Sequence, residues 1–203
     1  MFKKNKSSKT ILVTSGSRES LDSGGNQVRP TGGSHSHTSS NETLFGSREM
    51  LIEGRAGSLS RIIQFQLGYL GFINDITLNY NAQQDIEVQL IEKIEDCQLE
   101  GKIDIVLKDE QIINMIISKH GIKVTNPNTE EVYQRHPLQQ VAQIIHYQDG
   151  LGKANLGLRI SQVGKSGSSC YVFQCKSEDQ ARRICHSLNI IFDSIIHKGT
   201  STT

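Results

Sequence analysis

Apolar and polar residues alternate along the first strongly patterned stretch of the chain. In RIIQFQLGYLGFI, residues 61–73, four apolar side chains share one parity: Ile63, Phe65, Leu67 and Tyr69. A period of two is typical of a strand with one buried face. Ordered structure is therefore expected to begin near Ser60, with a half-buried β-strand.

The period becomes helical over residues 85–100. DIEVQLIEKIEDCQLE places one apolar stripe at Ile86, Leu90, Ile94 and Cys97, and Gly101 can end the helix. The opposite face is acidic and includes Glu95, Asp96 and Glu100. One interpretation of these charges is a solvated helix face, and the alternative is a docking surface for a basic ligand segment.

Six further segments have strand character, and a long amphipathic helix follows them. The strands are expected over residues 111–118, 121–124, 131–138, 139–147, 156–161 and 169–176. Gly121 suits a hairpin because glycine accepts positive φ, and Pro127-Asn128 suits a β-turn. Ser177 and Gln180 form a capping box at the start of the last helix. Consecutive strands without βαβ alternation indicate an α+β domain, a curled sheet or open barrel with a helix packed across one end.

The first 58 residues lack this patterning. They are rich in Ser, Gly, Thr and Asn and hold too little apolar surface to offset about 1–2 kcal/mol of backbone entropy per residue. We expect a disordered tail over 1–58, a domain over 59–199 and a disordered end over 200–203. The tail is either a solubilising segment or a regulated one. Arg55 makes Ser58 a phosphorylation candidate, and four lysines form a nuclear-import candidate: Lys3, Lys4, Lys6 and Lys9.

Composition narrows the classes of function. A formal net charge of +1 and a pI near 7.7 argue against capture of nucleic acid by the whole chain. No apolar run approaches the roughly 20 residues that span a bilayer, so stable membrane insertion and a secretory signal are not expected. The four cysteines lack CxxC spacing, which indicates reduced thiols; Cys170 and Cys175 should point to opposite faces of their strand.

No arrangement of residues typical of catalysis is present in the sequence. The seven histidines form no HExxH motif and no relay with a cysteine. The Gly-Lys-Ser in SQVGKSGSS lacks the spacing of a phosphate-binding loop. We therefore expect no enzyme, no metal and no cofactor.

Several motifs, in order, resemble the phosphotyrosine-binding (PTB) domain family. They are GIKV, the NPNT turn, EEVYQRHPL and CYVFQCKSEDQARRICHSLNIIF, within residues 60–198. MFKKNK, SKHGIKV, RHPL, YQDGLG and FDSI are similar, more narrowly, to the integrin-binding adaptors of that family. The resemblance implies a pleckstrin-homology-like fold with two orthogonal antiparallel sheets and a C-terminal helix.

The resemblance also implies a binding mode, in which a peptide adds as a strand beside residues 139–147 and packs against the last helix. The candidate contacts are Leu138, Val141, Ala142, Ile144, Ile145, Tyr147, Ile184, Leu188, Ile191 and Phe192. Alternation does not decide whether Val141 and Ile145 or Ala142 and Ile144 face outward. Ala142 is smaller than the branched residue expected there, and Phe192 suits either ligand contact or core.

The expected ligands are NPxY-type motifs in integrin β cytoplasmic tails and in a scaffold that resembles the Krev-interaction-trapped protein. By competing with talin-like activators, the chain would restrain integrin activation. Lys119, Lys123, Arg135 and His136 form no clear pair of arginines for a phosphate, so binding should not require phosphorylation. We expect a monomer in the cytoplasm and at adhesion sites, with the basic cluster as the route to a nuclear location. The alternative is a phosphoinositide-binding module, which liposome sedimentation would detect.

Overall fold

The structure is a computed structural model that describes residues 9–12, 47–54, 58–108, 111–161, 164 and 167–199. Its helices are α1 (Ile86–Leu99) and α2 (Glu178–Gly199), and a 3₁₀ turn covers Leu138–Gln140. The strands are β1 (Lys9–Leu12), β2 (Ser47–Gly54), β3 (Ser58–Ile76), β4 (Ile112–Ser118), β5 (Gly121–Thr125), β6 (Val132–His136), β7 (Val141–Gln148), β8 (Ala154–Ser161) and β9 (Ser168–Gln174). The predicted α+β fold, with one strand, a helix, six strands and a final helix, is confirmed over residues 58–199.

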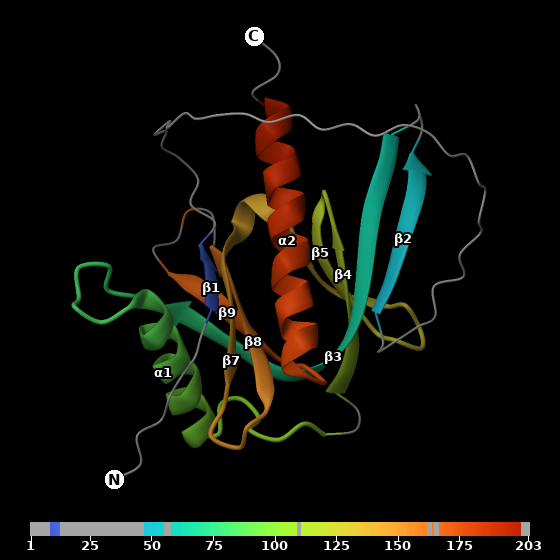
Figure 1. Cartoon of the computed structure of the whole chain (residues 1–203). Helices are drawn as coiled ribbons and strands as arrows, with labels where there is room; N and C mark the ends of the chain where they lie inside the picture. The colour runs from blue at the N-terminus through green and yellow to red at the C-terminus, as the bar shows by residue number, and fades with distance from the viewer. Residues whose placement is uncertain are drawn as a thin grey trace.

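All strand pairs are antiparallel, and the long strand β3 is shared by two halves of the sheet (Figure 1). The order is β1-β7-β8-β9-β3-β4-β5-β6, with β2 also on β3. Residues 63–68 of β3 pair with β4, whereas residues 68–76 pair with β9. The register shifts between Tyr69 and Gly71, where Gly71 has a φ of +135°. A bulge of this kind lets one strand turn from one half of a sheet into the other.

Two hydrophobic cores lie on opposite sides of the β7–β8–β9 half. The larger core contains α2 residues such as Leu188, together with Ile144 of β7 and Phe173 of β9. The smaller core contains α1 residues such as Ile94, together with Ile145 of β7. In Figure 1, α2 crosses in front of the sheet and α1 lies at its left side. Since both faces are covered, β7 carries consecutive apolar residues instead of a clean alternation.

The ends of both helices follow the sequence signals. The N–H of Gln180 donates to Ser177 Oγ at 3.2 Å, which confirms the predicted cap. The Gln180 side chain accepts from the Lys176 N–H and donates to the Gln66 carbonyl, so it also ties α2 to β3. At the end of α1, Gly101 has a φ of +71°, in agreement with its predicted role.

Two stretches of the tail for which disorder was expected are strands. β2 pairs with β3 from Ser47↔Phe65 to Gly54↔Ser58, and β1 pairs with β7. Composition did not predict these two strands, because the hydrogen bonds between paired strands use backbone N–H and C=O groups, and every residue except proline supplies both. The expectation of disorder is corrected for residues 9–12 and 47–54. Residues 1–8, 13–46, 55–57 and 200–203 lie outside the described part of the chain.

Candidate functional site

Strand β7 would be an edge strand of the main sheet without β1. On its inner side it pairs with β8 from Val141↔Ile160 to Gln148↔Ala154. On its outer side it pairs with β1, in the register Lys9↔His146, Thr10↔Ile145, Ile11↔Ile144 and Leu12↔Gln143. Helix α2 packs next to β7 (Figure 1). A ladder and a neighbouring helix are the two elements that recognition by strand addition requires.

A bulge in β7 decides which of its side chains face α2. The register with β8 skips Ala142 between Val141 and Gln143. As a result, Val141 and Ile144 lie in the core under α2, although they are three positions apart. Ala142 is half-buried. Alternation offered either Val141 and Ile145 or Ala142 and Ile144 as the outward-facing pair. Neither pair matches the structure.

Ile145 and Tyr147 lie on the other side of the sheet, in the core under α1. The Tyr147 hydroxyl is buried and has no hydrogen-bond partner among the described residues. Burial raises the pKa of this hydroxyl far above its ordinary value. The predicted contact set is thus divided between two faces.

The remaining predicted contacts lie on the α2 side of β7. Leu138 is buried in the 3₁₀ turn that leads into β7. Ile184, Leu188 and Ile191 of α2 are buried in the same core, with at most 4% of each exposed. Phe192 is half-buried and packs against the edge of that core. Of the helix residues proposed as contacts, Phe192 therefore has the most accessible surface.

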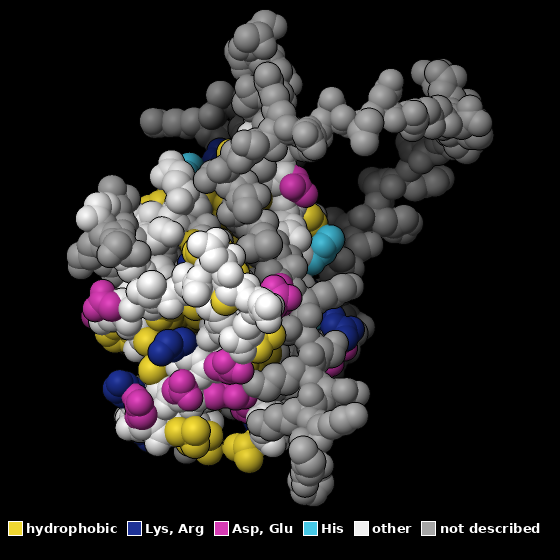
Figure 2. All heavy atoms as spheres, turned by 90° about the vertical axis from the view of Figure 1, so that its left-hand side faces the viewer, with side chains coloured by type: hydrophobic (Ala, Val, Ile, Leu, Met, Phe, Trp, Pro, Cys, Tyr) yellow, Lys and Arg dark blue, Asp and Glu magenta, His cyan; other side chains and the backbone are white. Residues whose placement is uncertain are grey.

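The acidic residues in the last turn of α1 and just after it have different neighbours. Glu95 lines a hollow of about 320 Å³ together with Gln98, Leu99, Ile105, Asp149, Gly150 and Leu151. Asp96 is exposed beside it. Glu100 instead accepts from Lys102 at 2.6 Å, and this lysine lowers the pKa of the Glu100 carboxyl. The space-filling view of this side shows acidic side chains gathered above a group of hydrophobic ones (Figure 2).

Asp149, just after the strand predicted over residues 139–147, supplies the second carboxylate of the hollow. Its Oδ1 accepts the N–H groups of Leu151 and Lys153, each at 2.9 Å, and its Oδ2 accepts from Asn155 at 2.9 Å. These bonds fix the β7–β8 turn and hold Leu151 outward, 63% exposed. An Asp-Gly turn signal alone does not reveal that this turn lies next to α1.

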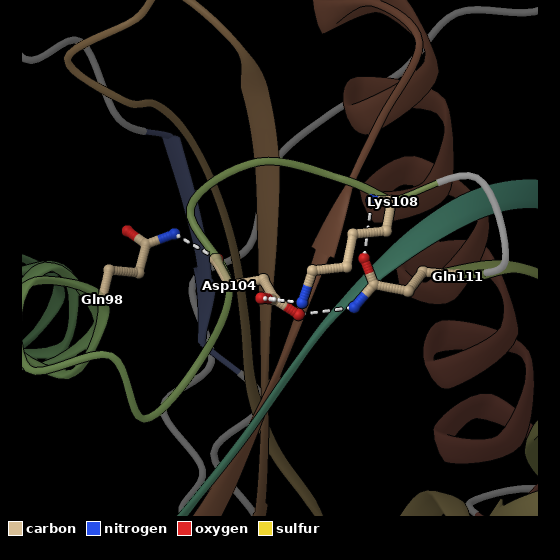
Figure 3. Close-up of polar contacts among 4 residues, drawn as sticks. All are labelled: Gln98, Asp104, Lys108 and Gln111. Carbon is tan, nitrogen blue, oxygen red and sulfur yellow. Dashed lines mark hydrogen bonds and ion pairs between the residues drawn. The ribbon is translucent and has the colours of Figure 1, made fainter.

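Asp104 makes polar contacts on both sides of the segment that carries Ile105, another lining residue of the hollow (Figure 3). Its carboxylate accepts from Lys108 Nζ at 2.8 Å and from Gln111 Nε2 at 2.5 Å. Its carbonyl accepts from Gln98 of α1 at 3.1 Å. These contacts hold the segment that carries Ile105, which is 42% exposed. The hollow thus combines two carboxylates with exposed apolar side chains, a composition that suits a basic and apolar peptide segment.

The candidate cations gather at a different place, around Gly121. A hollow of about 410 Å³ is lined by residues that include His120, Lys123, Arg135 and His136. Lys123 and Arg135 are directly opposite each other on β5 and β6. His136 is buried against Tyr171, with ring centroids 4.6 Å apart, and burial lowers its pKa. Burial therefore favours the neutral form of His136, and Lys123 and Arg135 are the stronger cations of this hollow.

The four cysteines are buried and free. Cys170 lies in the α1 core and Cys175 in the α2 core, so their predicted opposite orientations are confirmed. Burial raises the pKa of Cys170 and of Cys185 to about 12, so both remain protonated thiols at neutral pH.

The described residues contain no group of three or more His, Cys, Asp or Glu residues placed to hold a metal ion. They also contain no helix that is long and apolar enough to cross a membrane.

The tail candidates fall mostly beyond the described part of the chain. Lys3, Lys4 and Lys6 lie outside the described residues. Lys9 is the first residue of β1, and Ser58 is the first residue of β3, where it pairs with Gly54. The nuclear-import and phosphorylation candidates thus stay predictions.

Comparison with known proteins places the chain in a family. The sequence model described as beta-1 integrin binding protein matches residues 1–200. Integrin beta-1-binding protein 1 of Bos taurus is 34% identical over 135 residues, which is 66% of this chain and 67% of the bovine protein. The protein of that name from Mus musculus is 32% identical over 146 residues, 71% and 72% of the two chains.

A similar solved structure is the C-terminal phosphotyrosine interaction domain of APBB2 from mouse. It has a TM-score of 0.42 and 17% identity, and the match covers 77% of this chain and 95% of that domain. The strand order, β3 shared by two halves of the sheet and the long C-terminal helix agree with the fold that the sequence motifs predicted. The chain belongs to the beta-1 integrin binding protein family, a family of integrin-binding proteins and not of enzymes.

Proposed function

We propose that this chain is a non-enzymatic adaptor that binds NPxY-type motifs of integrin β cytoplasmic tails by strand addition at β7. The observation that carries the proposal is the outer ladder of β7, which takes up an antiparallel strand next to α2. We take the integrin as the partner because the bovine and mouse relatives are named integrin beta-1-binding protein 1. A Krev-interaction-trapped-like scaffold is the second proposed partner, and it would compete for the same edge.

The energetics of strand addition indicate where specificity must arise. Ladder hydrogen bonds contribute about 1 kcal/mol net each, which roughly offsets the cost of ordering the residues that make them. Affinity must then come from side chains beside the ladder, for which Ala142 and Phe192 are the accessible candidates. A micromolar dissociation constant, about −8 kcal/mol, is ordinary for such a surface. Occupation of an integrin tail by this adaptor would exclude activators that need the same motif, and integrin activation would be restrained.

The first test is a fluorescence-anisotropy titration of the full chain with three integrin β-tail peptides: NPxY, NPxA and phosphorylated NPxY. We expect saturable micromolar binding of NPxY, at least about tenfold weaker binding of NPxA, and no gain from phosphate. If only the phosphorylated peptide binds, phospho-independence is wrong and the hollow with Lys123 and Arg135 becomes the candidate phosphate site. If no peptide binds, the proposal fails and binding to phosphoinositide liposomes should be measured.

A second prediction compares the contributions of Glu95 in α1 and of Glu100, just after α1, to peptide binding. Glu95→Lys is expected to weaken binding of a peptide with arginine upstream of NPxY by about 5–10-fold, because it reverses one of two carboxylates that line the hollow. Glu100→Lys is the matched control and should have a smaller effect, since Glu100 does not line the hollow. Anisotropy titrations with the arginine peptide and with an alanine version measure both. Equal losses for the two peptides would contradict a charge-specific contact.

A further inference from the structure

Two buried polar side chains lie next to each other on β7 and β8. Gln143 of β7 is directly opposite Arg159 of β8, and Arg159 is directly opposite Cys170 of β9. Directly opposite residues of an antiparallel pair point to the same face of the sheet, and Cys170 lies in the core under α1. Gln143 and Arg159 therefore form a polar pair on the α1 side of the sheet.

The pair has complementary polar atoms that are not joined. Gln143 is fully buried, and neither its Oε1 nor its Nε2 has a hydrogen-bond partner among the described residues. Arg159 is also buried; its Nη2 donates to the Tyr80 hydroxyl at 3.0 Å, but its Nε has no partner there. The ion pairs among the described residues include none with Arg159. Burying an amide and a cation without partners is unfavourable, so both groups gain if a ligand supplies what is missing.

A peptide strand on the outer side of β7 brings one side chain to this pair. Gln143 pairs with Leu12 of β1 on that side, so the outer ladder extends to Gln143. The residue opposite Gln143 points to the same face, with Cβ atoms about 4.5–5.5 Å apart. Leu12 has no polar side-chain atom and leaves the amide unsatisfied. One position of a bound peptide therefore meets Gln143 on the side of the sheet away from α2.

The donors and acceptors of the pair define which ligand side chain fits. The Gln143 Oε1 can accept from the Arg159 Nε–H, which matches the unsatisfied acceptor of one residue with the unsatisfied donor of the other. The Gln143 Nε2 then remains as a donor toward the added strand and requires an acceptor there. We infer that Gln143 and Arg159 select an acidic residue, aspartate or glutamate, at the ligand position opposite Gln143. The inference rests on the proposed function of the β7 edge.

Charge favours a carboxylate over an uncharged acceptor at this position. Arg159 is already buried in the free protein, so its desolvation adds no further cost when the peptide binds. The attraction between an added anion and this cation is stronger in the protein interior than in water. A hydrogen bond to a charged group is also about twice as strong as a neutral one. Glutamate should therefore bind better than glutamine, and glutamine better than leucine.

This ligand position differs from the one that the acidic hollow would contact. A peptide antiparallel to β7 has its upstream end at the β7–β8 turn, where Asp149 lines the hollow. Gln143 lies earlier in β7, so it meets the peptide nearer to NPxY. The ligand class is thus a strand with basic residues upstream and an acidic residue closer to the NPxY motif.

The test begins with a glutamate scan of the labelled integrin β-tail NPxY peptide, titrated by fluorescence anisotropy against the full chain. Glutamate replaces in turn each of about six residues before NPxY, and leucine replaces the same residues in a parallel series. At one position glutamate should bind about tenfold more tightly than leucine. The positions directly before and after it should show no such gain, because their side chains point to the other face.

Three variants of the protein assign the preference. Gln143→Leu should remove it, and urea unfolding should show no loss of stability, since leucine replaces an amide without partners. Gln143→Glu places the anion in the protein, so the glutamate peptide should bind more weakly than the leucine peptide. Gln148→Leu, at an exposed position of the same strand, is the matched control and should keep the preference.

The outcomes separate this inference from the proposed function. NPxY binding without a favoured position, or a preference that survives in Gln143→Leu, would overturn the inference and leave the proposed function standing. Failure of every peptide to bind would overturn both. Loss of stability in Gln143→Leu would show that the amide has a partner in the free protein, which would overturn the inference whatever the peptides do.

Discussion

Replacing Gly121 by alanine is expected to lower the free energy of unfolding by about 3–4 kcal/mol. Gly121 has a φ of +136°, which an L side chain rarely adopts. A Cβ at this position would overlap the backbone carbonyl of His136 and press on the Cα of Pro137. Backbone cannot yield as a flexible side chain can, so the β5–β6 pairing and the entry into β7 would both be displaced.

Gly152→Ala provides the control for this prediction. Gly152 has a φ of +74°, but no atom lies within 4 Å of a Cβ built there. Its cost should be about 1 kcal/mol, from backbone strain alone. Urea unfolding followed by far-ultraviolet circular dichroism measures both variants, since the chain has no tryptophan. Equal losses would show that the overlap with His136 is relieved at little cost.

Leu188→Ala and Phe192→Ala should differ in which property they impair. Leu188 is fully buried in the α2 core, so its truncation should cost about 2–5 kcal/mol of stability. Phe192 packs against the same core but is only half-buried. Its truncation should cost less stability and should weaken binding of the NPxY peptide by about tenfold or more, if the exposed part of the ring contacts the ligand.

Each variant is measured by urea unfolding and by peptide titration under conditions where it is at least about 95% folded, which a stability of about 2 kcal/mol ensures. Ile195→Ala is the control for α2, because Ile195 is 42% exposed. A large affinity loss in folded Leu188→Ala, with none in Phe192→Ala, would contradict the assignment of Phe192 as the contact.

The sequence predicted the elements of the domain because their signals are local. A period of 3.6 identified α1 and α2, and Ser177 with Gln180 identified the start of α2. Glycine at 101 and 121 marked positions where the backbone does adopt positive φ. The approximate sites of ligand contact came from resemblance to the PTB family, whose motifs occur in the same order along this chain.

The faces of β7 were not predictable from the sequence. Alternation assumes a regular ladder on one covered face, but β7 has a bulge at Ala142 and a core on each side. The bulge depends on pairing with β8, and the second core depends on α1, which lies more than 40 residues earlier in the chain. Neither partner is visible in the eight residues of the strand itself.

The sequence by itself determined which segments are helices and strands, where several of them end, and the family to which the chain belongs, since each follows from residue type and local order. Only the tertiary structure decided which side chains share a surface. It brought Asp149 to Glu95 across the end of α1, separated Glu100 by pairing it with Lys102, and laid Lys9–Leu12 along β7. The physical reason is that such contacts join residues distant in the chain, and a strand ladder uses backbone groups that are the same in almost every residue.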